Sequence, residues 1–203
     1  MRKVVIDTET TGFSPGKGDR IVEIAGVEIL YDKITGHCFQ TYINPERDSH
    51  PKAEEVHGLS TEFLKSKPLF GDVARSFLRF VDGAEVIAHN AGFDVMFLNA
   101  EFTSHYGGSQ HLLNWVDRIT DTAPMAKKLF PGKKNSLDDL CKRYGVNADG
   151  RSKHHGALID CQLLAEVYLK MLNNEDGVLP ASHFPDVAER KGYDMSKHLA
   201  RSK

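Results

Sequence analysis

The sequence has little cysteine and no long apolar run, and these two absences already exclude several classes of protein. Its three cysteines, Cys38, Cys141 and Cys161, are odd in number and lack a Cys-x-x-Cys spacing, so we expect neither a zinc site nor a disulfide framework. A reducing, cytoplasmic location fits that usage. No apolar stretch approaches the ~20 residues that cross a bilayer, and the apolar start is too short for a signal peptide, so we expect no membrane partner.

A large excess of charge of one sign is also missing. The 203 residues carry a formal net charge of −2, whereas a protein that wraps duplex DNA by charge alone is usually more basic. Residues 121–155 nevertheless hold eight Lys or Arg against four Asp. This local excess permits phosphate contact on one side, although an ordinary solvated face explains it equally well.

The order of the expected elements indicates an α/β fold. Strands are expected over 3–9, 21–30 and 37–43, with a hairpin turn at 32–36, and then over 85–88 and 115–120. Helices are expected over 60–65, 71–82, 93–105 and 156–172, with further helices opened by Asp121 and by Ser136. This order predicts a mixed five-stranded sheet, antiparallel first and then parallel, flanked by helices. Residues 1–173 would form one domain, and 174–203 a C-terminal tail that is weakly structured or docks on a partner.

The first expected strand carries two acidic residues on one face. Asp7 and Glu9 are separated by one residue, and side chains alternate along a strand. Two carboxylates so close repel unless a cation lies between them, and hard cations such as Mg²⁺ prefer oxygen ligands. Gly12 would let a ligand approach the backbone. A bare Asp-x-Glu is more often a solvated strand edge.

Two further signals lie at helix starts. Asp94 follows His89-Asn90-Ala91-Gly92-Phe93 and could be a ligand or simply a favourable charge at the helix N-terminus, while Phe93 could pack in the core or stack on a base. His155 and Asp160 are five residues apart, about 140° around a helix. Their side chains can converge only if His155 lies before the first turn of the helix. The chain would then bend between His155 and the helix, and Gly156 makes such a bend easy.

Taken together, these signals favour a two-metal site. Four carboxylates in one pocket are costly unless divalent cations neutralise them, and two ions can hold both oxygens of a phosphoryl displacement. A histidine that titrates near neutrality suits the role of base for the attacking water.

At this point the sequence resembles a known family. The segments 7–12 (DTETTG), 56–59 (VHGL), 89–94 (HNAGFD), 130–138 and 155–160 (HGALID) are similar to the histidine subtype of the DEDD exonuclease superfamily, with its RNase H-like fold. Within it, the likeness is strongest to the proofreading subunits of bacterial replicative polymerases. It covers about residues 3–172.

The resemblance implies roles for individual residues. Asp7, Glu9, Asp94 and Asp160 match the carboxylates that bind two Mg²⁺ or Mn²⁺, and His155 matches the general base. The terminal-nucleotide pocket corresponds, besides Asp7, Glu9 and Asp160, to Thr10, Gly12, Val56, His57 and Phe93. His57 could equally be an ordinary loop histidine.

The implied activity is hydrolysis of the last phosphodiester of DNA from its 3′ end, releasing nucleoside 5′-monophosphates. The substrate would be a single-stranded or frayed 3′ end, gripped by stacking and by a basic track of Lys127, Lys128, Lys133 and Lys134. A DNA polymerase catalytic subunit is the candidate protein partner. Two alternatives remain open at this stage: a 3′–5′ exoribonuclease of the same superfamily, and a non-catalytic polymerase-accessory or nucleic-acid-binding module.

Overall fold

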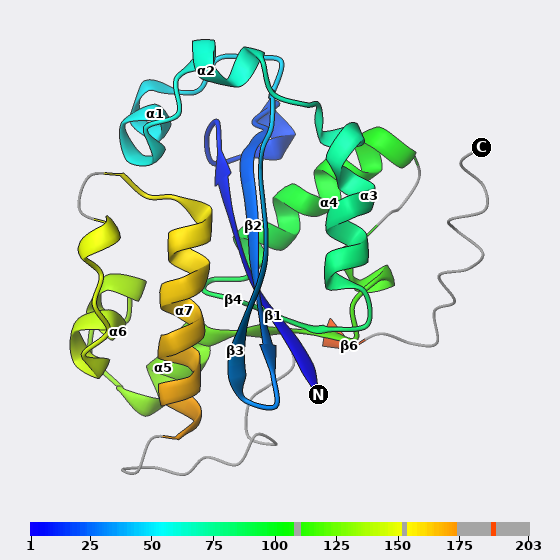
Figure 1. Cartoon of the computed structure of the whole chain (residues 1–203). Helices are drawn as coiled ribbons and strands as arrows, with labels where there is room; N and C mark the ends of the chain where they lie inside the picture. Colours follow the sequence, from blue (N-terminus) through cyan, green and yellow to red (C-terminus); the bar gives the residue numbers. More distant parts are fainter. Residues whose placement is uncertain (108–110, 152–153, 174–187, 190–203) are drawn as a thin grey trace.

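A mixed β-sheet forms the centre of the computed structural model, which describes residues 1–107, 111–151, 154–173 and 188–189 (Figure 1). The spatial order of its strands is β3-β2-β1-β4-β5-β6. The strands are β1 (Arg2–Thr10), β2 (Ile21–Leu30), β3 (Lys33–Tyr42), β4 (Glu85–Ala88), β5 (Arg118–Asp121) and β6 (Ala188–Glu189). β2 pairs antiparallel with β1 and β3, whereas β1, β4 and β5 run parallel, so the predicted mixed sheet is confirmed.

The sixth strand was not predicted. β6 adds two residues antiparallel to β5, within the segment that the sequence analysis assigned to a tail. Two residues carry no periodic pattern, so the sequence gives no signal for such a strand. The rest of the predicted tail, residues 174–187 and 190–203, lies outside the described residues.

The turn between β2 and β3 corrects the predicted hairpin. It consists of Tyr31 and Asp32, with φ of 51° and 57°, the two positive angles of a type I′ turn. β3 therefore begins at Lys33, and Gly36 (φ 82°) lies within the strand. The register shifts between Val27 and Ile29, so Gly36 marks a bulge and not a turn.

Seven α-helices are described, and one of them was missed by the sequence analysis. They are α1 (Pro51–His57), α2 (Thr61–Lys65), α3 (Phe70–Val81), α4 (Gly92–Tyr106), α5 (Thr122–Leu129), α6 (Leu137–Tyr144) and α7 (Ala157–Leu172), with 3₁₀ turns at Pro15–Lys17, Leu112–Asn114 and Asp149–Arg151. The missed helix, α1, has seven residues, too few to show an apolar period. Its boundaries follow from Pro51 at its first turn and Gly58 in the left-handed region at its end.

Two helical layers cover the sheet, and β1 sends alternate side chains into each. Val4 and Ile6 belong to the core formed with α3 and α4, whereas Val5 belongs to the core formed with α5, α6 and α7. Figure 1 shows α3 and α4 on one side and α7 on the other. Because side chains alternate, Asp7 and Glu9 face the side of α7, and Thr8 faces the side of α4.

Among the described residues, no helix combines the length and the apolar character that a bilayer span needs.

Candidate active site

Three side chains from β1 and from the start of α7 come together at one point. Ligand atoms of Glu9, His155 and Asp160 all lie within 4.8 Å of one another. His155 Nδ1 lies 3.9 Å from Asp160 Oδ2. This convergence is possible because His155 precedes Ala157, the first residue of α7, and so is not bound to the helical rotation. The donor set of two carboxylates and an imidazole fits a divalent cation.

Asp7 and Asp94 both act electrostatically on Cys161 in α7. Burial raises the pKa of the Cys161 thiol, and the negative charges of Asp7, Asp94, Asp160 and Glu23 raise it further. Because the Coulomb interaction weakens with distance, these four charges act together on the part of α7 that carries Cys161. Of the four acidic residues named by the sequence analysis, Glu9 and Asp160 belong to the cluster with His155, whereas Asp7 and Asp94 are related to it through their electrostatic effect on α7.

Asp94 is a buried carboxylate that is attached to β1. It lies in the first turn of α4, is 3% exposed, and accepts a hydrogen bond at 2.7 Å from the hydroxyl of Thr8. Burial raises its pKa to about 7, although the Thr8 hydrogen bond opposes that shift. A bound cation would stabilise the ionised form of such a buried carboxylate, because a nearby opposite charge offsets the cost of burial. Thr8 was not identified from the sequence, since a threonine in a strand is ordinary.

Glu23 is a further acidic residue that the sequence analysis missed. It is 1% exposed on β2 and lies opposite Glu9 in the strand register. Its carboxylate accepts hydrogen bonds from Gln40 Nε2 at 2.7 Å and from the Ala157 amide at 3.2 Å. Burial raises its pKa. The available signal was a glutamate between apolar residues, Val22 and Ile24, in a mostly apolar strand.

The loop after β1 requires glycine at position 12. The Thr10 hydroxyl donates to the Gly12 carbonyl at 2.6 Å, and the His50 amide donates to the Thr11 carbonyl at 2.8 Å. A Cβ at Gly12 would collide with the carboxylate of Asp19 and with the ring of His50. The backbone of β1 and the segment before α1 therefore pack together directly at the end of β1.

The end of α1 contacts the segment that carries His155. The His155 amide donates to the Val56 carbonyl at 2.9 Å, and the Val56 side chain is 46% exposed beside it. A Cβ at Gly58 (φ 69°) would come within 2.7 Å of the His154 ring. These contacts fix His155 relative to α1.

His57 is a buried, neutral histidine. Burial, followed by the nearby charge of His154, lowers its pKa to about 4. Its Nδ1 accepts a hydrogen bond from the Leu59 amide at 3.0 Å, so the proton is on Nε2. Nε2 is buried and has no hydrogen-bond partner among the described residues. It is a donor that a ligand could satisfy.

Phe93 packs in the core, the first of the two roles that the sequence left open. Its ring lies 4.9 Å from that of Phe97 and packs against the core, yet the side chain stays partly exposed. Thr10, by contrast, is buried and points its hydroxyl back at the loop.

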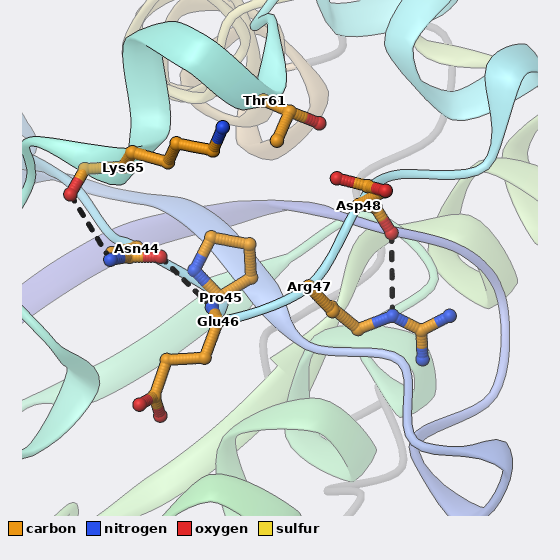
Figure 2. Close-up of a pocket in the computed structure, with 7 residues that line it drawn as sticks. All are labelled: Asn44, Pro45, Glu46, Arg47, Asp48, Thr61 and Lys65. Atoms are coloured by element: carbon orange, nitrogen blue, oxygen red, sulfur yellow. Dashed lines mark hydrogen bonds between the residues drawn. The ribbon is translucent and has the colours of Figure 1, made fainter.

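A separate pocket of about 250 Å³ lies beside α2 (Figure 2). It is lined by Asn44, Pro45, Glu46, Arg47, Asp48, Thr61 and Lys65. Asn44 Nδ2 donates to the Lys65 carbonyl at 3.2 Å, and Arg47 Nη1 also reaches Asp19 at 3.2 Å. None of the residues that the sequence analysis predicted for the site lines this pocket.

Comparisons with known proteins place the chain among exonucleases. The model of the RNase_T exonuclease family matches residues 4–168. The chain is 48% identical over 172 residues to a DNA polymerase III subunit epsilon of Rickettsia conorii, covering 85% of this chain and 74% of the relative. It is 43% identical over 178 residues to the same subunit of Escherichia coli K12, covering 86% and 72%.

Solved structures show the same fold. Exonuclease X in complex with 5′ overhanging duplex DNA is 27% identical, with a TM-score of 0.67 over 90% of this chain and 96% of that one. A 3′-exonuclease bound to a histone mRNA stem-loop is 16% identical, with a TM-score of 0.71 over 95% and 72%. At that identity the likeness is one of fold alone.

Proposed function

Because this chain belongs to the exonuclease family and is a relative of the DNA polymerase III epsilon subunits, we propose that it hydrolyses DNA from the 3′ end. Each turnover breaks the terminal phosphodiester and releases a nucleoside 5′-monophosphate. Removal of mismatched 3′ nucleotides is the biological task that fits its relatives. The observation that carries the proposal is the convergence of Glu9, His155 and Asp160 within 4.8 Å.

Two divalent cations, Mg²⁺ or Mn²⁺, would be held by Asp7, Glu9, Asp94 and Asp160. Supporting this assignment, hard cations take carboxylate oxygens, and the gathered negative charge would otherwise be costly. When bound, such ions stabilise charge on the attacking and leaving oxygens of a phosphoryl displacement.

His155 is the proposed general base. Its ring lies within 4.8 Å of the Glu9 and Asp160 carboxylates and is partly exposed, so water can reach it. Asp160 Oδ2, 3.9 Å from its Nδ1, would stabilise the imidazolium that forms when the ring takes a proton from the attacking water.

The terminal nucleotide would occupy the space bordered by Thr10, Gly12, Val56, His57 and Phe93. His57 offers an unsatisfied Nε2–H donor, and the exposed parts of Val56 and Phe93 offer apolar surface for a base. Lys127, Lys128, Lys133 and Lys134 are all exposed and would follow the phosphates.

A single-stranded DNA oligonucleotide with a 3′ label tests the proposal. The wild type should release labelled mononucleotide only when Mg²⁺ or Mn²⁺ is present. Asp7→Asn and Asp160→Asn should abolish release, and His155→Ala should reduce it about 10²–10⁴-fold, as expected for a lost general base. Glu166→Gln, which changes an exposed carboxylate on the same helix as Asp160, is the matched control.

The same assay separates the proposed substrate from its alternatives. An RNA strand of matched sequence that is degraded faster than the DNA would identify an exoribonuclease. Tight binding of DNA without release of nucleotide would identify a non-catalytic module. A primer–template with a mismatched 3′ end, trimmed faster than a matched one, would support proofreading alongside a DNA polymerase catalytic subunit.

A further inference from the structure

We propose that Glu23 is a positioning residue that places His155 and Asp160 by holding the start of α7. The inference rests on the proposed function, since it concerns the same site. Glu23 lies on β2 and belongs to neither the set of metal ligands nor the nucleotide pocket.

The two oxygens of Glu23 have separate partners. Oε2 accepts from the amide of Ala157, the first residue of α7, while Oε1 accepts from Gln40 Nε2 on the neighbouring strand β3. The residue that precedes the helix, Gly156, has no side chain with which to satisfy the free amides of the first turn. Glu23 supplies that acceptor from the sheet, 134 residues away in the sequence.

The location of this hydrogen bond matters because of what lies on either side of it. His155 is two residues before Ala157, and Asp160 is three residues after it. On the other side of Gly156, the His155 amide is held by the Val56 carbonyl at 2.9 Å. The short segment from His155 to Ala157 is thus attached to α1 at one end and to β2 at the other.

A buried carboxylate at this position lowers the stability of the fold unless its hydrogen bonds compensate. Glu23 is 1% exposed, lies opposite Glu9 and feels the negative charge of Asp160. Burial among like charges disfavours ionised groups, so an apolar residue would be the better choice if packing were its only role. The acceptor for Ala157 is the contribution that an apolar residue cannot make.

Two substitutions separate positioning from charge. Glu23→Ala removes the acceptor, whereas Glu23→Gln removes the charge but keeps an amide oxygen that can still accept from Ala157. Its new NH2 group can donate to Gln40 once the Gln40 amide turns its oxygen toward it. We expect Glu23→Ala to lower kcat about 10–100-fold on 3′-labelled single-stranded DNA, because a misplacement near 1 Å has an effect of that size. KM for DNA should stay nearly constant, and Glu23→Gln should restore most of kcat.

Hydrogen exchange at the Ala157 amide, measured by NMR without metal, reports on the anchor directly. Exchange should accelerate in Glu23→Ala and remain near the wild-type rate in Glu23→Gln. Glu28→Gln is the control. It also removes a negative charge from β2, but Glu28 pairs with Arg2 and does not contact Ala157. Thermal unfolding identifies any variant that fails to fold, and kcat is referred to folded protein.

Two results would overturn the proposal: an unchanged kcat and exchange rate in Glu23→Ala, or a loss of kcat in Glu23→Gln equal to that in Glu23→Ala. If the wild type itself releases no nucleotide, the proposed function fails instead. The exchange rate of Ala157 then still decides whether Glu23 holds α7.

Discussion

The hydroxyl of Thr8 donates a 2.7 Å hydrogen bond to the carboxylate of Asp94, although 86 residues separate the two in the sequence. This contact ties the first turn of α4 to the last part of β1. Burial raises the pKa of Asp94 to about 7, and the hydrogen bond from Thr8 only partly opposes that rise. The ionised carboxylate of Asp94 therefore lowers the stability of the folded protein, as is common for ionisable groups in functional sites.

Asp94→Asn should stabilise the metal-free protein while abolishing nuclease activity. The folded pKa of Asp94 is raised, so the folded state binds more protons than the unfolded state between about pH 4 and 7, and the free energy of unfolding falls as pH rises through that window. At about pH 8 the substitution should raise that free energy by ~1–3 kcal/mol, since a buried charge is removed.

Urea unfolding with EDTA, at about pH 5 and pH 8, measures this effect. The gain should be larger at the higher pH. Asp117→Asn, at an exposed aspartate, should change the free energy little at either pH. Loss of stability in Asp94→Asn at the higher pH would contradict the account.

His57 should make the protein sensitive to acid. Its folded pKa is about 4, against an ordinary value of 6.5, so the unfolded state binds more protons in that interval and stability falls as pH decreases through it. His57→Gln should remove this part of the pH dependence. The difference in unfolding free energy between variant and wild type, followed from about pH 7 to 4.5, isolates the contribution of His57. A flat difference would show that His57 is not buried in a neutral form, and His37→Gln, at an exposed histidine, provides the baseline.

Gly58→Ala should lower kcat by displacing the segment that carries His155. Two effects combine at this position: φ is 69°, and the new Cβ would press on the His154 ring. Gly83→Ala is the matched control, because φ is 62° there and no atom lies within 4 Å. Both variants should lose about 1 kcal/mol of stability from backbone strain. Only Gly58→Ala should also lose activity, and equal kcat values in the two variants would argue against a role for this contact.

Gly12→Ala should weaken substrate binding. Its Cβ would displace Asp19 or His50 and thereby open the loop that follows β1. We expect KM for single-stranded DNA to rise about 10-fold or more, because binding geometry is lost before chemistry begins. Gly16→Ala, in the same loop with its nearest neighbour at 3.8 Å, should leave KM unchanged. An unaltered KM in Gly12→Ala would place the nucleotide elsewhere.

Patterns within one element were sufficient to predict much of this structure. The alternation of side chains along β1 predicted that Asp7 and Glu9 share one face. The apolar period predicted a helix over 156–172, and α7 spans Ala157–Leu172. The capping residues Asp121 and Ser136 open α5 and α6 as expected, with side chains that accept from Ala123 and Asp139. These features depend on neighbours in the sequence.

Contacts between distant segments could not be predicted in this way. Thr8 meets Asp94, and Glu23 meets Ala157, only because the sheet brings their elements together. The hairpin turn was misplaced for a different reason: Tyr31 and Asp32 adopt positive φ without the Asn-Gly pair that usually signals a type I′ turn.

The central claim is that the gathered carboxylates hold divalent cations for hydrolysis at a 3′ end. Anomalous diffraction from crystals grown with Mn²⁺ and a nucleoside 5′-monophosphate tests it most directly. We predict two peaks about 3.5–4 Å apart among Asp7, Glu9, Asp94 and Asp160, with the phosphate beside His155. Mn²⁺ bound elsewhere, or no Mn²⁺ among these side chains, would contradict the claim.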